Sequence, residues 1–107
     1  MQISISSRHG SLSREMSDYM QEKLAKFAKI FERIESIAAT VELRPAETRV
    51  EILVNAEHKH DLVARDGAPS FHAAVDLAVH KMEAQLRRYK ERIQEHRRAP
   101  PMGGNAQ

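Results

Sequence analysis

The 107-residue sequence has no cysteine and only five aromatic side chains. The absence of cysteine excludes disulfide bonds, thiolate catalysis and cysteine-rich zinc sites. No apolar run approaches the roughly 20 residues that a membrane-spanning helix needs. Residues 1–10 lack the basic start and the long apolar stretch of a secretion signal. We therefore expect one cytoplasmic domain that has no membrane partner.

Positive charge is concentrated near one end of the chain. Residues 81–98 carry seven bases and three acids, a net charge of +4, whereas the whole chain nets +2 and the remainder therefore nets −2. A nucleic-acid partner would be recognised by this local concentration of charge rather than by an overall basic protein.

Four strands are predicted from alternating apolar and polar side chains. The last strand has the weakest pattern, and a loop is predicted directly after it at Asp66–Pro69. The predicted strands cover residues 2–7, 37–44, 48–56 and 60–66.

Two helices are predicted from apolar side chains that recur at steps of three or four. The first begins after the N-cap Ser13 and keeps apolar residues on one face as far as Ile34, over about six turns. The second begins after Ser70 and keeps its apolar face as far as Ile93. Residues 99–107 have almost nothing to bury and are expected to be disordered.

The predicted order of elements is β-α-β-β-β-α. The first strand, first helix and second strand form a crossover unit that pairs those strands in parallel. Short turns make the later strands antiparallel. Since every helix and strand has one apolar side, the predicted fold is an α+β two-layer sandwich over residues 1–98. It places two helices on one face of a four-stranded mixed sheet.

The second helix carries a row of bases beside its apolar face. At about 100° per residue, Lys81, Arg88 and Arg92 fall within a narrow arc, and Gln85 lies next to them. The row is about 16 Å long, which is enough to contact several phosphates of a nucleic acid. Arg87 lies further round the helix, so the positive surface is broad.

The first helix has its own group of bases off the apolar face. If the two helices lie side by side, both groups would form one continuous positive patch. Charges on a helix are also commonly just a solvated face, and Glu22 precedes Lys26 by four residues, a favourable pairing distance. For the second helix, seven bases exceed what pairing and the helix dipole require. The bases of the first helix are Lys23, Lys26, Lys29 and Arg33.

Four segments resemble those of the short ribosome hibernation-promoting factors and ribosome-associated inhibitors, also called sigma-factor modulation proteins. The resemblance covers about residues 1–96, and the segment at 70–93 is the most specific. Three residues depart from the family pattern there: Ser70 replaces a capping Asp, His72 stands where Tyr is usual, and Ala84 replaces a frequent Arg. The segments are MQISIS (1–6), SREMSDYMQEKLAKFAKIFERI (13–34), RVEILV (49–54) and SFHAAVDLAVHKMEAQLRRYKERI (70–93).

The resemblance implies a factor that binds the small ribosomal subunit in the channel used by messenger and transfer RNA. Such a factor silences and protects idle ribosomes in stress or stationary phase. It needs no catalysis, cofactor or small-molecule substrate, and a second ribosome-pairing factor is left open as a partner. Carried over by position, the residues implied to contact ribosomal RNA are Lys23, Lys26, Lys81, Gln85, Arg88, Lys90 and Arg92. The charge pattern adds Lys29, Arg87 and Arg33, and Arg8 in the turn after the first strand is a further candidate.

Other classes of function have less support. His58 and His60 share one side of a predicted strand beside Asp61, but two histidines do not make a three-ligand metal site. Asp76 is better explained as a neighbour of Lys81 than as a catalytic acid, and no glycine-rich phosphate loop or nucleophile motif is present. A protein-interaction module that modulates a sigma factor is the main alternative. A DNA-binding helix-turn-helix is not indicated.

The few aromatic residues of the sequence lie mostly on apolar faces. The predicted sheet therefore lacks the exposed aromatic rows that stack on single-stranded bases. We expect contacts with RNA to be made mainly to phosphates and to shape.

Overall fold

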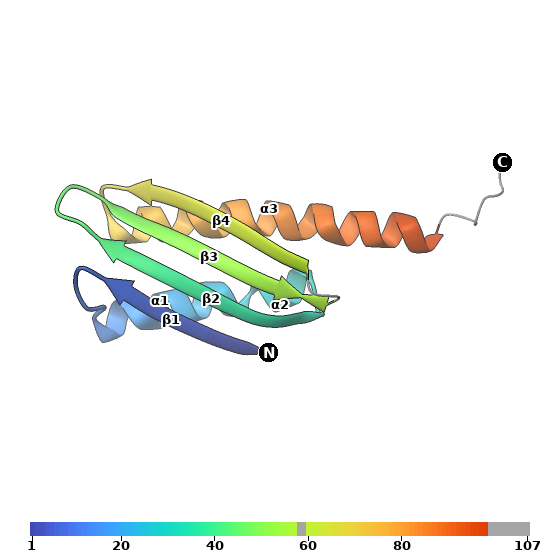
Figure 1. Cartoon of the computed structure of the whole chain (residues 1–107), viewed down its shortest axis with the longest axis horizontal. Helices are drawn as coiled ribbons and strands as arrows, with labels where there is room; N and C mark the ends of the chain where they lie inside the picture. Colours follow the sequence, from blue (N-terminus) through green and yellow to red (C-terminus); the bar gives the residue numbers. More distant parts are fainter. Residues whose placement is uncertain (58–59, 99–107) are drawn as a thin grey trace.

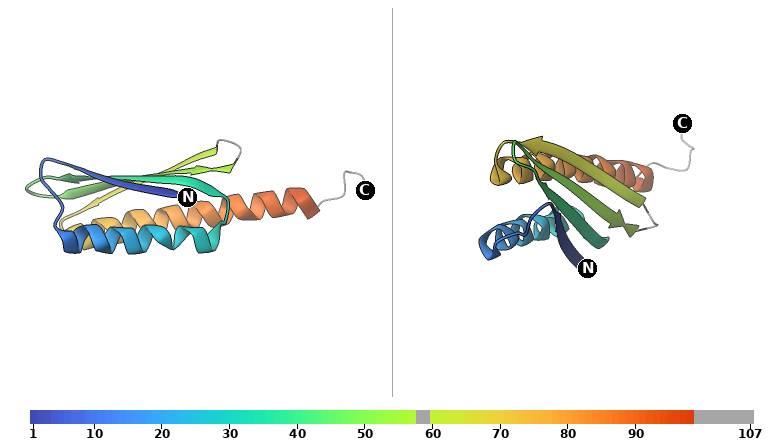
Figure 2. Two further views of the ribbon diagram at one scale, coloured as in Figure 1. Left: turned by 90° about the horizontal axis from the view of Figure 1, so that it is seen from below. Right: turned by 60° about the vertical axis from the view of Figure 1, so that its left-hand side comes forward.

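The structure is a computed structural model that describes residues 1–57 and 60–98, with side chains as far as Gln94. The helices cover one face of a four-stranded sheet, so the predicted α+β two-layer sandwich is confirmed (Figures 1 and 2). The disorder predicted for residues 99–107 concerns positions outside the described ones. The elements are β1 (Gln2–Arg8), α1 (Arg14–Ala25), α2 (Phe27–Ile30), β2 (Ile34–Leu43), β3 (Thr48–Ala56), β4 (His60–Ala68) and α3 (Phe71–Arg98).

The strands lie in the sheet in their sequence order, β1-β2-β3-β4. β1 pairs with β2 in parallel, whereas β2–β3 and β3–β4 are antiparallel, as predicted. The register places Ile37 opposite both Ile3 and Val54, so apolar side chains from neighbouring strands point to the same face. The helices cover that face, and each large apolar side chain buried there contributes about 1.5–3 kcal/mol.

The first predicted helix is shorter than expected, and this prediction was wrong at its C-terminal end. α1 stops at Ala25, α2 stops at Ile30, and Phe31 already has extended backbone angles, φ −139° and ψ 114°. Ile34 begins β2 and buries its side chain from the strand. A step of three from Phe31 to Ile34 fits a helix face, but both positions reach the core equally well when the chain turns into a strand.

β4 is longer than predicted and takes in most of the predicted loop at Asp66–Pro69. Gly67 pairs with Arg49 and Ala68 with Thr48, so the ladder continues through Ala68. A Cβ atom at Gly67 would lie 3.1 Å from Glu47 Oε1. Glycine at this position therefore leaves room for the Glu47 side chain instead of ending the strand.

α3 is the longest element, and its apolar face confirms the predicted one. The Ser70 hydroxyl accepts a hydrogen bond from Ala73 N–H at 3.2 Å, which caps the helix start. Val75, Met82 and Leu86 are completely buried. With 28 residues the helix is about 42 Å long, and its C-terminal turns extend beyond the sheet (Figure 1).

Tyr89 marks the point where α3 leaves the sheet. Its ring packs against Phe31 with centroids 5.1 Å apart, and its hydroxyl donates a hydrogen bond to the Glu57 carbonyl at 3.3 Å. These contacts fix the outgoing half of α3 to the ends of α2 and β3. Together with the packing of Ile93 against the core, they help to position Lys90 and Arg92.

Candidate nucleic-acid interface

On one flank of α3, two polar side chains reach the outer edge of β4. Lys81 Nζ lies 3.2 Å from Asp66 Oδ2 and donates a hydrogen bond to the Arg65 carbonyl, also at 3.2 Å. One turn later, Gln85 Nε2 donates to the Val63 carbonyl at 2.7 Å. Both predicted RNA contacts are therefore engaged within the molecule.

Arg88 and Arg92 follow on the same flank, one and two turns beyond Gln85. Together with Gln85, Leu62 and Glu91 they line a shallow hollow beside β4. Both arginine side chains are exposed, and neither forms an ion pair with an acid in the described part of the chain. Two guanidinium groups beside an open hollow are well suited to bind phosphate oxygens.

The opposite flank of α3 faces α2. There Lys90 shares a hollow with Lys29 and Arg33, over Phe31 and Ile93. Arg33 is paired with Glu57 through a 3.0 Å hydrogen bond, whereas the two lysines have no acidic partner among the described residues. The two flanks thus each present positive charge, with the helix between them.

Lys23 occupies a third position, between α1 and the start of α3. Its Nζ lies 3.9 Å from Asp76 Oδ1 and 5.2 Å from the centre of the Tyr19 ring. The Tyr19 hydroxyl donates a 2.5 Å hydrogen bond to the same carboxylate oxygen. That hydrogen bond, with help from burial, raises the pKa of Tyr19 to about 12. Lys23 therefore already has an acidic and an aromatic partner within the protein, at the surface between α1 and α3.

Seven of the predicted contact residues are exposed and have no ion pair with an acid within residues 1–57 and 60–94. One of them, Arg8, lies at the other end of the sheet, at the end of β1. The other six lie at the junction of α1 and α2, on α2 or on the C-terminal half of α3. We call them the distal bases: Lys26, Lys29, Arg87, Arg88, Lys90 and Arg92. The expected ion pair between Glu22 and Lys26 is not formed. Because the distal bases have no internal partner, their charge is available to a ligand.

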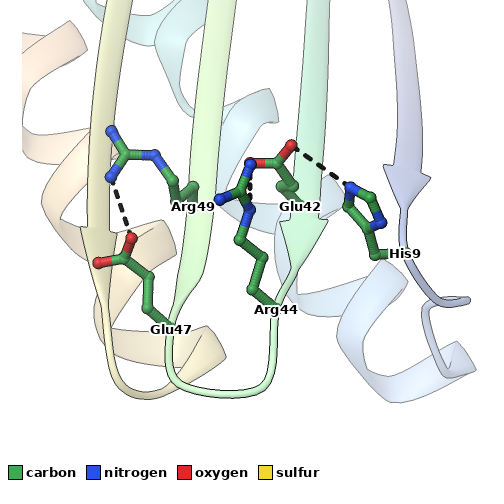
Figure 3. A network of polar contacts seen from close by, with 5 residues as sticks. All are labelled: His9, Glu42, Arg44, Glu47 and Arg49. Atoms are coloured by element: carbon green, nitrogen blue, oxygen red, sulfur yellow. Dashed lines mark hydrogen bonds and ion pairs between the residues drawn. The ribbon is translucent and has the colours of Figure 1, made fainter.

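The opposite end of the sheet carries the β2–β3 turn, and three of its basic side chains have acidic partners (Figure 3). Arg44 Nε lies 3.0 Å from Glu42 Oε1, and Arg49 Nη1 lies 3.1 Å from Glu47 Oε2. His9 Nε2 lies 3.7 Å from Glu42 Oε2. The Arg44 hydrogen bond is the main reason that the pKa of Glu42 is lowered.

Arg8 lies at this paired end as well. It lines a hollow on the open face of the sheet together with Glu42 and Arg49. Its charge also helps to lower the pKa of Glu42. Arg8 is thus remote in the fold from the distal bases, although it is also exposed and has no ion pair with a described acid.

Arg88 and Arg92 line the β4 flank of α3, whereas Lys90 shares a hollow on the other flank with Lys29 and Arg33. One prediction about layout was wrong, because Asp76 was expected beside Lys81. Asp76 is paired with Tyr19 and Lys23, and the acid beside Lys81 is Asp66. Sequence spacing placed the residues around the helix correctly but did not reveal which neighbour each would meet.

Among the described residues, no three His, Asp or Glu side chains come close enough to hold a metal ion. His60 packs beside the Tyr89 ring, with centroids 5.0 Å apart. His58 lies outside the described residues. No described helix is both long and apolar enough to span a membrane.

Comparison with known proteins settles the family. The model of the family described as "Sigma 54 modulation protein / S30EA ribosomal protein" matches residues 3–94, which include every described strand and most of α3. The chain belongs to this family. The resemblance seen in the sequence is thereby confirmed.

Members of the S30EA family with similar sequences have been named for ribosome hibernation. The ribosome hibernation promoting factor of Pseudomonas putida strain KT2440 is 27% identical over 103 residues, covering 88% of this chain and 91% of the relative. The factor of the same name from Azotobacter vinelandii is 26% identical over 92 residues, covering 86% and 85%.

Two solved structures share the fold. A ribosomal subunit interface protein from Coxiella burnetii has a TM-score of 0.78 at 22% identity, covering 85% of this chain and 99% of that one. The N-terminal domain of Protein Y from Thermus thermophilus has a TM-score of 0.75 at 23% identity, covering 83% and 99%. The two-layer arrangement is thus a property of known proteins and not of this sequence alone.

Sequence reasoning missed the acids that neutralise part of the basic series. Asp66 was predicted at the junction of the fourth strand and the loop after it, and its contact with Lys81 was not foreseen. Tyr19 and Asp76 are 57 residues apart in sequence. No local pattern reports such a pair, although the step of four from Tyr19 to Lys23 could have placed both on one side of α1.

Proposed function

We propose that this protein is a ribosome hibernation factor that binds the small ribosomal subunit in the channel for messenger and transfer RNA. The distal bases bind phosphates of ribosomal RNA, and the bound protein blocks the channel by occupying it. No chemical step is needed for this inhibition. The family and the names of its relatives support the general role, and the geometry supports the surface.

One observation carries the choice of surface. Arg44 and Arg49 at the β2–β3 end of the sheet are paired with acids and leave Arg8 as the unpaired arginine there, whereas the six distal bases are exposed without such partners in the described chain. A paired base must give up its partner before it binds a phosphate, and an unpaired one does not. Nucleic-acid affinity depends strongly on such free positive charge.

The two hollows on either side of α3 suggest how RNA is held. A helix with its side chains is about 10–12 Å across. Arg88 and Arg92 on one flank, and Lys90 with Lys29 on the other, therefore present charge in two directions at once. This arrangement suits a helix that enters a narrow RNA-lined channel better than one that lies on a flat surface.

Co-sedimentation with ribosomes tests the proposal. The purified protein is centrifuged through a sucrose gradient with small subunits, large subunits or whole ribosomes, at low and at high salt. We expect it to migrate with the small subunit and the whole ribosome at low salt and to be released at high salt. The variant with Arg88→Glu and Arg92→Glu should stay at the top, while Arg44→Glu should still migrate with the subunit.

A sigma-factor modulator would behave differently in the same gradient. Such a protein would remain at the top in the presence of ribosomes at moderate salt, because its partner is an acidic protein surface. Purified ribosomal RNA would also fail to compete for its binding. Either result would reject the ribosomal proposal in favour of that alternative.

A further inference from the structure

Besides Arg33, which pairs with Glu57, three of the predicted RNA contacts already have partners inside the protein. Lys81 reaches the Arg65 carbonyl and Asp66, and Gln85 reaches the Val63 carbonyl. On the other flank of α3, Lys23 lies beside Asp76. All three contacts involve the first half of α3, up to Gln85, whereas four of the six distal bases lie on the second half, from Arg87 onward.

The contacts at β4 lie along one edge of the sheet. β4 is the last strand in the order β1-β2-β3-β4, so no other strand of the described residues pairs with its outer side. Carbonyls on such an edge are free to accept hydrogen bonds from water or from another chain. Lys81 and Gln85 donate to two of them, two residues apart along β4 and one helical turn apart along α3. The side chains therefore join α3 to this strand at two points.

A second set of contacts holds the other flank of the same half-helix. The Tyr19 hydroxyl bonds to Asp76 Oδ1, and the His72 ring packs edge-on against Tyr19 with centroids 4.4 Å apart. The apolar face of α3 fixes how deeply the helix sits on the sheet. These polar contacts on its two sides limit its sideways shift and its rotation.

We infer that Lys23, Lys81 and Gln85 are positioning residues, which fix the first half of α3 between α1 and β4 and so set where Arg88 and Arg92 meet RNA. They do not themselves bind phosphate. This inference rests on the proposed function and divides α3 into an anchored half and a binding half. It assigns Lys81 and Gln85 a role different from the one that their sequence positions implied.

The first test uses the partner of Lys81 instead of Lys81 itself. Asp66→Asn removes the acid but keeps an oxygen for the Gly67 N–H, which Asp66 Oδ1 accepts at 2.8 Å. If Lys81 bound phosphate, freeing it from Asp66 would tighten the binding of the protein to small subunits. If Lys81 is a positioning residue, freeing it from Asp66 does not increase the affinity. Asp61→Asn is the matched control, since Asp61 lies on the same strand and bonds to Asn55 at 2.7 Å.

We expect Asp66→Asn to bind isolated small subunits no more tightly than Asp61→Asn does. Both variants lose one negative charge, so their comparison removes the general effect of charge. Binding by Asp66→Asn that is threefold tighter than that of the control would overturn the inference for Lys81. The same comparison with Asp76→Asn tests Lys23.

The second test asks whether Gln85 acts through the arginines. Gln85→Met keeps the length of the side chain and removes the donor to Val63. We expect about threefold weaker binding in the wild-type background. In the Arg88→Gln, Arg92→Gln background we expect less than a 1.5-fold further loss. All proteins are compared at a temperature where circular dichroism shows them folded, so lost stability alone does not change the affinity.

Each outcome has a distinct meaning. Equal losses in both backgrounds would make Gln85 an independent RNA contact, and no loss in the wild-type background would make it purely structural. Both results overturn the inference while leaving the proposed function in place. If the wild-type protein itself fails to bind small subunits, the proposed function fails instead, and the positioning role fails with it.

Discussion

The salt dependence of ribosome binding should report how many of the distal bases contact phosphate. Each phosphate neutralised on a duplex lowers the slope of log K against log salt by about 0.9. Six exposed bases without acidic partners therefore predict a slope of roughly −5. Raising salt fourfold, from 50 to 200 mM, should weaken binding about a thousandfold.

Replacing Arg88 and Arg92 with Gln removes two of these charges without touching the core. The slope should become less steep by about 1.8, since two contacts of about 0.9 each are lost. Fluorescence anisotropy of labelled protein, titrated with small subunits at four salt concentrations, measures the slope directly. Circular dichroism confirms that the variant is folded.

A matched control removes two arginines from elsewhere. Arg14 is paired with Asp18 at 4.0 Å and Arg44 with Glu42 at 3.0 Å, and both lie away from the distal bases. The Arg14→Gln, Arg44→Gln variant should keep the wild-type slope. An unchanged slope in the Arg88 and Arg92 variant, or an equal drop in the control, would refute the assignment of the surface.

Three further predictions concern stability. Met82→Asp should abolish folding, because Met82 is completely buried. An unpaired charge there costs several kcal/mol, which is much of the stability of a small domain. A native circular dichroism spectrum would contradict this prediction. Tyr19→Phe should lower the free energy of unfolding by about 1 kcal/mol at pH 7. Since the pKa of Tyr19 is raised to about 12, the wild type should lose this contribution between about pH 10 and 12, and urea titrations of the variant should lack that loss. The Gly67 N–H and Lys81 lower the pKa of Asp66, so ionised Asp66 adds to the free energy of unfolding above about pH 4, and this contribution is lost on acidification below it. Asp66→Asn should therefore reduce the fall of the melting temperature at acidic pH. An unchanged fall would argue against the Lys81 contact.

The sequence predicted the order of elements and most of the core because both depend on local periodicity. β3 was predicted at its observed bounds, since Val50, Ile52 and Val54 alternate with polar residues and the strand is paired on both sides. The same reasoning failed at residues 31–34, where the spacing of the apolar residues does not distinguish a helix from the start of a strand. The step from Phe31 to Ile34 fits a helix, and only the burial of Ile34 against the sheet shows that the chain has already become a strand.

The candidate surface shows the same division. Lys81, Arg88 and Arg92 were correctly placed on one side of α3, because a helix fixes the angle between residues. Their different environments were not predicted. Lys81 meets Asp66 because β4 runs beneath it, whereas Arg88 and Arg92 lie where no described acid comes within ion-pairing distance.

By itself, the sequence determined the α+β fold class, the apolar faces of both helices and the concentration of bases on α3. These features follow from short-range spacing along the chain. The tertiary structure alone decided which bases are neutralised, which are left for a ligand and how they divide between the flanks of α3. Those outcomes depend on the acids of other elements, such as Asp66 on β4 and Glu57 after β3, and only packing brings these acids beside the bases.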